Sequence, residues 1–279
     1  MASSELSAPD KAGATVLDRF AVDQIADLTW RGRDCDPLGG RMYGGTLAAR
    51  LLAAARAATV GPPATSGLDI HFLQPADGGL PIDYHVERAH DGRSSAVRRV
   101  TATQHGRTVA VGTVSFHTPR DGWSHGRRDP GEKPDGLPAK GLPHRARAVR
   151  ATDFDIRYHD ESTQEHGVVR RLWFRALEDL PAAVAVHECV LTFLSDIYFF
   201  EPICLEHGYQ GNDRKIRYGT TQHAMWFHQR PVLSDWLLIE SRSPVLAGGR
   251  GLVYGEVRTV GGDPVATIVQ EVAIGLTPA

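Results

Sequence analysis

Apolar and polar residues alternate along two long stretches of the chain, in the way that half-buried antiparallel strands alternate. Residues 94–117 predict a strand, a turn at 104–107 and a second strand. Residues 252–276 predict the same succession, with a turn at 261–263. Each stretch opens on a short Gly-Arg motif, which is the first sign that the two halves of the chain share one design.

Each pair of predicted strands is preceded by one predicted helix. Residues Gly44 to Ala58 are rich in Ala, Leu and Arg, the strongest helix formers, and Gly61-Pro62-Pro63 ends the helix. Residues Leu180 to Phe200 are apolar almost all round and are expected to stay helical until just before Pro202. A helix that is apolar on nearly every face must be wrapped by other structure.

The two halves also match at a nearly constant offset. Arg93 lies 157 residues before Arg250, and Pro75 of HFLQP lies 156 residues before Pro231 of WFHQRP. A repeat of this length is the size of a domain, so it indicates a duplicated domain and not a solenoid.

Proline and glycine interrupt residues 118–150 every few positions, which predicts a linker. We therefore expect an N-terminal domain over 1–117, this linker, and a C-terminal domain over 151–279. A curved antiparallel sheet around one long helix, present twice, is an α+β architecture called a tandem or double hotdog. The exposed outer strands of such sheets also predict self-association into a homo-oligomer.

Composition narrows the classes of function. The 279 residues are 42% hydrophobic and 23% charged, with 31 Lys and Arg against 33 Asp and Glu, as in ordinary soluble proteins. This near-neutral charge offers no reason to expect a nucleic-acid partner. The start, MASSELSAPD, lacks the features of a signal peptide, and no apolar run reaches the roughly 20 residues that span a bilayer. These features predict a cytoplasmic protein with no membrane partner.

Metal and cofactor chemistry is not expected. The three cysteines, Cys35, Cys189 and Cys204, show no CxxC spacing and are interpreted as free thiols. His223 and His228 have no cysteine or carboxylate at ligand spacing, so they are interpreted as packed or hydrogen-bonded histidines.

Several motifs carry a resemblance to a known family. They are RMYGG (41–45), HFLQPAD (71–77), DGRSSAVRRVTATQHGR (91–107), LSDIYF (194–199), TTQHAMWFH (220–228), DWLLIESRSP (235–244), GRGLVYGEV (249–257) and VATIVQE (265–271). With these motifs the chain resembles the acyl-CoA thioesterase II family over roughly residues 16 to 276. The resemblance implies the double hotdog fold, an acyl-CoA substrate and hydrolysis of its thioester.

The resemblance also implies three catalytic residues. In that family a water molecule is held by an Asp late in the long helix, a Thr at the start of the HxMWFH strand and a Gln in the last strand. These positions fall on Asp196, Thr220 and Gln270. Thr221 is adjacent to Thr220 and leaves an ambiguity, which counting back from His223 resolves toward Thr220. The family often has an acidic residue where this chain has Gln222.

The residues make chemical sense for such a reaction. Thioester hydrolysis requires a base for the attacking water and donors for the developing oxyanion, but no metal. Apolar neighbours of Asp196 should raise its pKa toward the range of a general base. Without the resemblance, the sequence favours an Asp196 that ends a helix by bonding solvent or backbone, and a Gln270 that faces outward from its strand.

Substrate contacts are less sharply defined. Gly44 and Gly45 precede a helix whose free N–H groups could bind an oxyanion, or they could only permit close packing. The candidate partners for the phosphates of CoA are Arg93, Arg98, Arg99 and Arg250. Exposed strand arginines are commonly just solvated, and that interpretation stays open for these four.

Two other functions compete with hydrolysis. A hotdog hydratase or dehydratase needs an Asp and a His at one site, and Asp36-Pro37 has no nearby histidine. A protein that only binds acyl-CoA is the third reading, against which the full Asp196, Thr220 and Gln270 set speaks. No GxSxG motif is present, which argues against a serine hydrolase of the α/β type.

Overall fold

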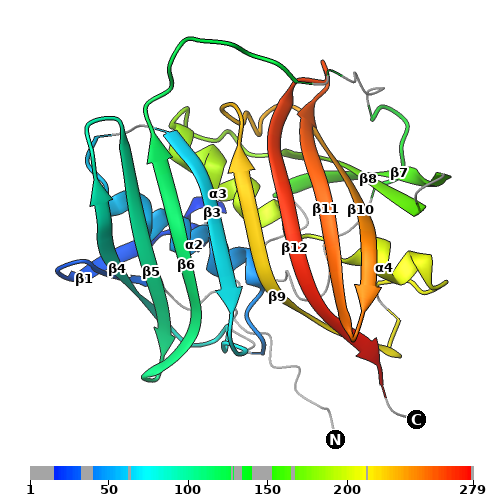
Figure 1. The fold of residues 1–279 in the computed structure, drawn as a ribbon, viewed down its shortest axis with the longest axis horizontal. Helices are drawn as coiled ribbons and strands as arrows, with labels where there is room; N and C mark the ends of the chain where they lie inside the picture. The colour runs from blue at the N-terminus through cyan, green and yellow to red at the C-terminus, as the bar shows by residue number, and fades with distance from the viewer. Residues whose placement is uncertain are drawn as a thin grey trace, which may run out of the picture.

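The computed structural model describes residues 16–32, 40–61, 64–126, 128, 134–139, 153–164, 167–211 and 213–277. Their strands form one antiparallel sheet (Figure 1). The strands before the predicted linker are β1 (Val22–Ala26), β2 (Thr29–Gly32), β3 (Ala64–Phe72), β4 (Ile82–Asp91), β5 (Ser95–Gln104) and β6 (Arg107–His117). Those after it are β7 (Phe154–Gln164), β8 (Gly167–Ala176), β9 (Ile216–Phe227), β10 (Leu237–Ala247), β11 (Arg250–Thr259) and β12 (Pro264–Leu276).

Strand order shows the duplication directly. The sheet runs β1-β2-β4-β5-β6-β3-β9-β12-β11-β10-β8-β7. Read outward from the junction of β3 and β9, the strands of the two halves therefore follow each other in the same order. The halves join where β3 pairs with β9, from Gly67 opposite Trp226 to His71 opposite Gln222. The predicted strand pairs at 94–117 and 252–276 are confirmed as β5–β6 and β11–β12. The boundaries of the two domains stay a prediction.

The helices lie on one face of the sheet, which curls around them at both ends (Figure 1). They are α1 (Val16–Phe20), α2 (Gly44–Ala57), α3 (Val184–Leu194) and α4 (Glu201–Glu206). The prediction of a helix from 44 to 58 is confirmed by α2, which packs against α3 at the junction of the halves. The side chains between the helices and the sheet form a single apolar core.

A buried ion pair fixes α3 against the first half. The Glu188 carboxylate on α3 is 2% exposed and accepts hydrogen bonds from Arg56 (2.8 Å) and from the hydroxyl of Thr65 (2.6 Å). Because each charge is paired and bonded within the protein, loss of either partner would leave an uncompensated buried charge.

One predicted helix is wrong in its length. Residues 180–200 do not form one helix: α3 ends at Leu194, and α4 begins only at Glu201. Between them Tyr198 adopts a positive φ of 57°, which a continuing helix cannot contain. Pro202 does not mark the end of a helix but lies in the first turn of α4, where a missing N–H has no cost.

Cys189 and Cys204 are free and buried, and burial raises the pKa of the two thiols to about 12 and about 11. Cys35 lies outside the described residues, as do Asp36 and Pro37 of the hydratase reading. Among the described residues, none of the helices is long and apolar enough to cross a membrane.

Candidate active site

The carboxylate of Asp196 lies where the two halves meet, just after the end of α3 and at the beginning of α2. Its oxygen approaches Gly44 so closely that an added Cβ there would lie 2.8 Å from Oδ2. At Gly45 an added Cβ would lie 2.4 Å from the carbonyl oxygen of Phe193. The two glycines therefore permit the start of α2 to reach the end of α3.

The two glycines differ in whether their backbone N–H groups are available to bind an oxyanion. The backbone N–H of Gly45 donates a hydrogen bond to Asp196, so this amide is already used by the carboxylate. The positive end of the α2 dipole adds to the stabilisation of the ionised group. Gly44 lines the adjacent cavity as the first residue of α2, where a helical N–H has no acceptor within the helix.

Thr220 and Gln270 reach the same oxygen of Asp196. The Thr220 hydroxyl donates to Oδ1 at 3.3 Å, and the Gln270 amide donates to it at 2.6 Å. The structure thus brings together the three residues that the sequence pattern singled out from a helix end and two different strands.

A bulge in β9 decides between the two threonines. Gln222 pairs with Glu271 and Thr220 with Val272, so Thr221 is an extra residue opposite the β12 strand. Bulges of this kind re-aim side chains next to active sites. Here the bulge turns Thr220 toward Asp196, while the Thr221 hydroxyl donates to the Glu271 carbonyl oxygen (3.2 Å).

Burial of the carboxyl group dominates its acidity. It raises the pKa of Asp196 to about 6, against the lowering effects of the bonds from Gln270, Thr220 and Gly45 and of the charge on Arg41. A carboxylate with this pKa is mostly ionised at pH 7 and is still basic enough to accept a proton from water in a transition state.

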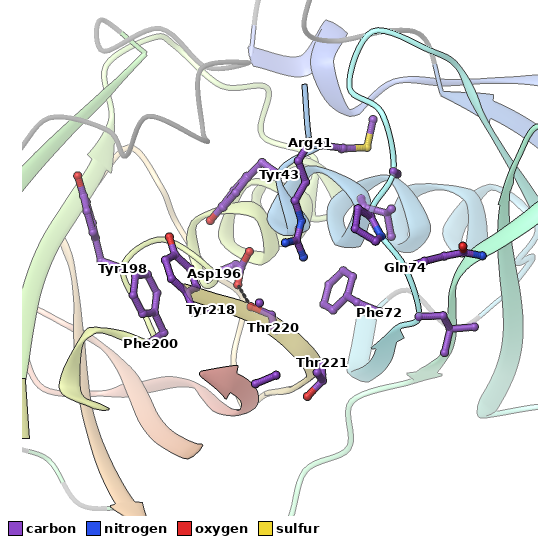
Figure 2. A pocket seen from close by; sticks show the side chains of 18 residues that line it. Arg41, Tyr43, Phe72, Gln74, Asp196, Tyr198, Phe200, Tyr218, Thr220 and Thr221 are labelled. Carbon is purple, nitrogen blue, oxygen red and sulfur yellow. Dashed lines mark hydrogen bonds between the residues drawn. The ribbon is translucent and has the colours of Figure 1, made fainter. Parts of the chain in front are cut away.

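The carboxylate opens onto a cavity of about 280 Å³ (Figure 2). Both halves of the chain contribute to its walls. The apolar and aromatic side chains that line it include Met42, Tyr43, Leu47, Phe72, Leu73, Tyr198, Phe200 and Tyr218. A mainly apolar cavity with a few convergent polar groups is the usual form of a small-molecule site.

Arg41 is the functional candidate that the sequence did not reveal. Figure 2 shows its guanidinium group pointing toward the space between Thr220 and Phe72. Gly219 makes room for it, since an added Cβ there would lie 3.1 Å from a guanidinium nitrogen. RMYGG contained the residue, but nothing in the pattern said that a segment before α2 would lie against β9.

The arginines proposed for CoA lie elsewhere, and for Arg98 the prediction is wrong. Its side chain is 1% exposed, and its guanidinium donates to the carbonyl oxygens of Ala58 and His90 and to Asp91. It completes the C-terminal end of α2 and has no surface to offer a ligand.

The other three predicted arginines are exposed. Arg99 pairs with Glu87 at 3.2 Å and Arg250 approaches Glu271 at 3.5 Å, while Arg93 lies in the turn between β4 and β5. None of the three lines the cavity. No group of three or more His, Cys, Asp or Glu side chains arranged to hold a metal occurs among the described residues.

Family models of known proteins match both halves of the chain. Residues 32–117 match the family model of the acyl-CoA thioesterase N-terminal domain, and residues 127–274 match that of the C-terminal domain. The chain is 27% identical to acyl-CoA thioesterase 2 of Haemophilus influenzae over 275 residues, which cover 92% of this chain and 95% of that protein.

Solved structures give the same result for the fold. The acyl-CoA thioesterase II of Mycobacterium marinum superposes with a TM-score of 0.81 at 27% identity, covering 94% of this chain and 98% of that one. A protein of unknown function with a hot dog fold from Alicyclobacillus acidocaldarius, at 22% identity, superposes with a TM-score of 0.74 over 94% of this chain and 98% of its own.

Fold and comparisons together define a double hotdog enzyme of the thioester hydrolase class. The chain belongs to the acyl-CoA thioesterase II family.

Proposed function

We propose that the protein hydrolyses acyl-CoA to a free carboxylic acid and CoA, by direct attack of a water molecule that Asp196 activates. The single observation that carries the proposal is the Asp196 carboxylate, which is held by Thr220 and Gln270 at the wall of the cavity that the two halves share. The names of the relatives, all acyl-CoA thioesterases, supply the substrate class.

In the proposed reaction, water attacks the thioester carbonyl carbon while Asp196 accepts one of its protons. The C–O bond forms, and the negative charge that develops on the carbonyl oxygen is stabilised by hydrogen-bond donors. The tetrahedral intermediate then breaks its C–S bond. CoA leaves as a thiolate that takes up the proton held by Asp196, which restores the base, and the carboxylic acid is released.

Two groups are proposed as oxyanion donors. The Gly44 N–H is at the first position of α2 and on the cavity wall, and the Arg41 guanidinium points into the same space. Gly45 is left out because its N–H already binds Asp196. For the nucleotide end of CoA, Arg93, Arg99 and Arg250 stay proposals on the ground of their charge and exposure.

Incubation with a panel of acyl-CoAs of graded chain length, with free thiol as the readout, tests the proposal. We expect thiol release by the wild type and at least ~100-fold less by Asp196→Asn. Substrate loss without thiol would instead support the hydratase reading. Binding without any turnover would support an acyl-CoA-binding protein, and either result would overturn hydrolysis.

A further inference from the structure

His223 is a buried residue that contacts the same amide nitrogen of Gln270 as Asp196 does. It is 1% exposed and packs edge-on against Phe199. Its two ring nitrogens have different partners: Nδ1 lies 3.2 Å from the Gln270 amide nitrogen, and Nε2 lies 2.8 Å from the Ser195 hydroxyl. The catalytic role proposed above makes no use of this residue.

The hydrogen bonds around His223 have only one consistent direction. The Ser195 hydroxyl donates its one proton to the carbonyl oxygen of Thr192 at 2.8 Å, so it must accept from Nε2. Nε2 therefore carries the proton of the neutral imidazole, and Nδ1 is the unprotonated nitrogen. Nδ1 can then only accept, which requires the Gln270 amide nitrogen to donate one proton to it and the other to Asp196. The series ends on the last turn of α3.

This series fixes which way the Gln270 amide faces. A glutamine amide can rotate by half a turn and exchange its oxygen and nitrogen. Rotation here would direct Oε1 at the Asp196 carboxylate and at the unprotonated Nδ1. Both contacts would then join two acceptors, and neither could be a hydrogen bond. The opposite histidine tautomer would favour the rotated amide. The proton on Nε2, held by Ser195, prevents that exchange.

We propose that His223 is a positioning residue of the active site: held in its Nε2–H tautomer by Ser195, it orients the Gln270 amide so that the amide donates to Asp196. The inference rests on the proposed function, because it assigns His223 a role in that same site. His223 touches neither substrate nor reacting atoms in this role.

Three substitutions separate the two hydrogen bonds of His223. In His223→Asn the side-chain oxygen can take the place of Nδ1 and still accept from Gln270. In His223→Gln the terminal amide can take the place of Nε2 and reach Ser195, leaving nothing at Nδ1. His223→Leu has neither. We expect kcat to fall by roughly tenfold in His223→Gln and His223→Leu, but by no more than about threefold in His223→Asn, with KM little changed in all three.

The pH profile of kcat adds a readout that loss of packing would not change. The bond from Gln270 lowers the pKa of Asp196, so its loss should move the midpoint of the profile upward in His223→Gln and not in His223→Asn. The titratable and charged groups around Asp196 and its cavity are Arg41, Tyr43, Tyr198 and Tyr218, whereas only burial shifts the pKa of His223. They are the same in every variant.

A second histidine, just beyond the end of β9, provides the matched control. His228 lies just after β9 and bonds Thr267 at 2.7 Å, without contact to Gln270. His228→Gln should leave kcat and the pH midpoint unchanged. Equal losses in His223→Asn and His223→Gln, or a midpoint that stays constant in His223→Gln, would overturn the proposal.

The tautomer can also be read in the wild-type protein, which covers the case in which no variant at 223 folds. Nitrogen NMR of the imidazole should show the proton on Nε2 and no titration between about pH 5 and 8, since burial lowers the pKa of His223 to about 4. A proton on Nδ1, or an imidazolium in that range, would refute the role of His223. Absence of thiol release by the wild type would refute the proposed function instead.

Discussion

The two halves of the sheet carry the same topology but fill the same row of positions with different chemistry. In the second half, Gln270 of β12 pairs with His223 of β9. At the corresponding place in the first half, Val114 of β6 pairs with Leu68 of β3, and both side chains are buried. One duplicated framework thus holds a polar pair on one side of the junction and an apolar pair on the other.

On the neighbouring strands, β11 and β5, the buried polar residue is in the first half instead of the second. Gln270 pairs on its other side with the buried Val253 of β11, whereas Val114 pairs with Arg98 of β5. The Arg98 guanidinium donates hydrogen bonds to the carbonyl oxygen of Ala58 at the end of α2, to that of His90, and to the carboxylate of Asp91. The first half therefore uses its buried polar residue to finish a helix, and the second uses its own to hold a carboxylate.

The two long helices also differ at their N-terminal ends. α2 begins with Gly44 and Gly45, and its N-terminus receives Asp196 from the second half. α3 follows Ala183 at its N-cap position and has no glycine in its first turn. The comparison teaches that both halves build the candidate active site: the first half supplies the helix N-terminus and much of the cavity wall, and the second supplies the carboxylate that we propose as the base, with its two hydrogen-bond donors.

The largest effect should come from Asp196→Asn, which keeps the shape of the side chain and removes the base. We expect kcat to fall at least ~100-fold. Asp69→Asn is the matched control in the first half, because Asp69 bonds Gln222 on β9 without contact to the cavity. It should keep nearly full activity. Retained turnover in a folded Asp196→Asn variant would remove Asp196 from the mechanism.

The supports of Asp196 should matter less than the carboxylate. Gln270→Leu, which makes this position as apolar as Val114, should lower kcat by roughly 30-fold, and Thr220→Val by about fivefold. Groups that act as a unit lose function non-additively, so the triple alanine variant at 196, 220 and 270 should be barely worse than Asp196→Ala. Steady-state kinetics of the set decides the matter, since simply additive losses would contradict a shared site.

Activity should depend on pH as a buried base requires. The base form of Asp196 is lost as pH falls through its pKa of about 6, so kcat should rise with pH and level off above about pH 7. At pH 5 it should be about tenfold below the plateau, as expected for one group. A profile already flat at pH 5, measured on wild-type protein that stays folded, would contradict this assignment.

The last prediction concerns stability and not activity. Because the folded-state pKa of Asp196 is raised, ionisation destabilises the native state as pH rises from below the ordinary carboxyl value through about 6. Asp196→Asn should therefore increase the free energy of unfolding at pH 8 by up to about 3 kcal/mol, and most of this gain should vanish near pH 4. Urea unfolding at both pH values measures it, and an equal change at the two would exclude ionisation as the cause.

The local sequence predicted the strands well where a glycine marked the turn between them. Gly106 and Gly262 adopt positive φ in the two strand turns, as their place in the sequence required. The break between α3 and α4 could not be predicted, because apolar residues continue through it and the positive φ of Tyr198 has no signal in the sequence. The resemblance singled out Asp196, Thr220 and Gln270, yet the bulge that selects Thr220 is a property of strand pairing.

Arginines were the least predictable part of the site. Sequence alone gave no way to tell Arg98, which is buried beneath the end of α2, from its exposed neighbour Arg99. Arg41 was missed because its importance depends on a contact between the segment before α2 and Gly219 of β9. Long charged side chains take their role from what lies at their tips, and local periodicity does not report that.

The central proposal is that Asp196 acts as a base toward water and does not itself attack the thioester. Rapid-quench single turnover of an acyl-CoA in 18O-labelled water tests it most directly. The mass of the peptide that contains Asp196 is followed together with that of the released acid. Direct attack of water predicts label in the acid and an unmodified, unlabelled peptide at every time point. An acyl adduct on Asp196, or labelled oxygen in its carboxylate, would show that Asp196 acts as a nucleophile and would contradict the proposed mechanism.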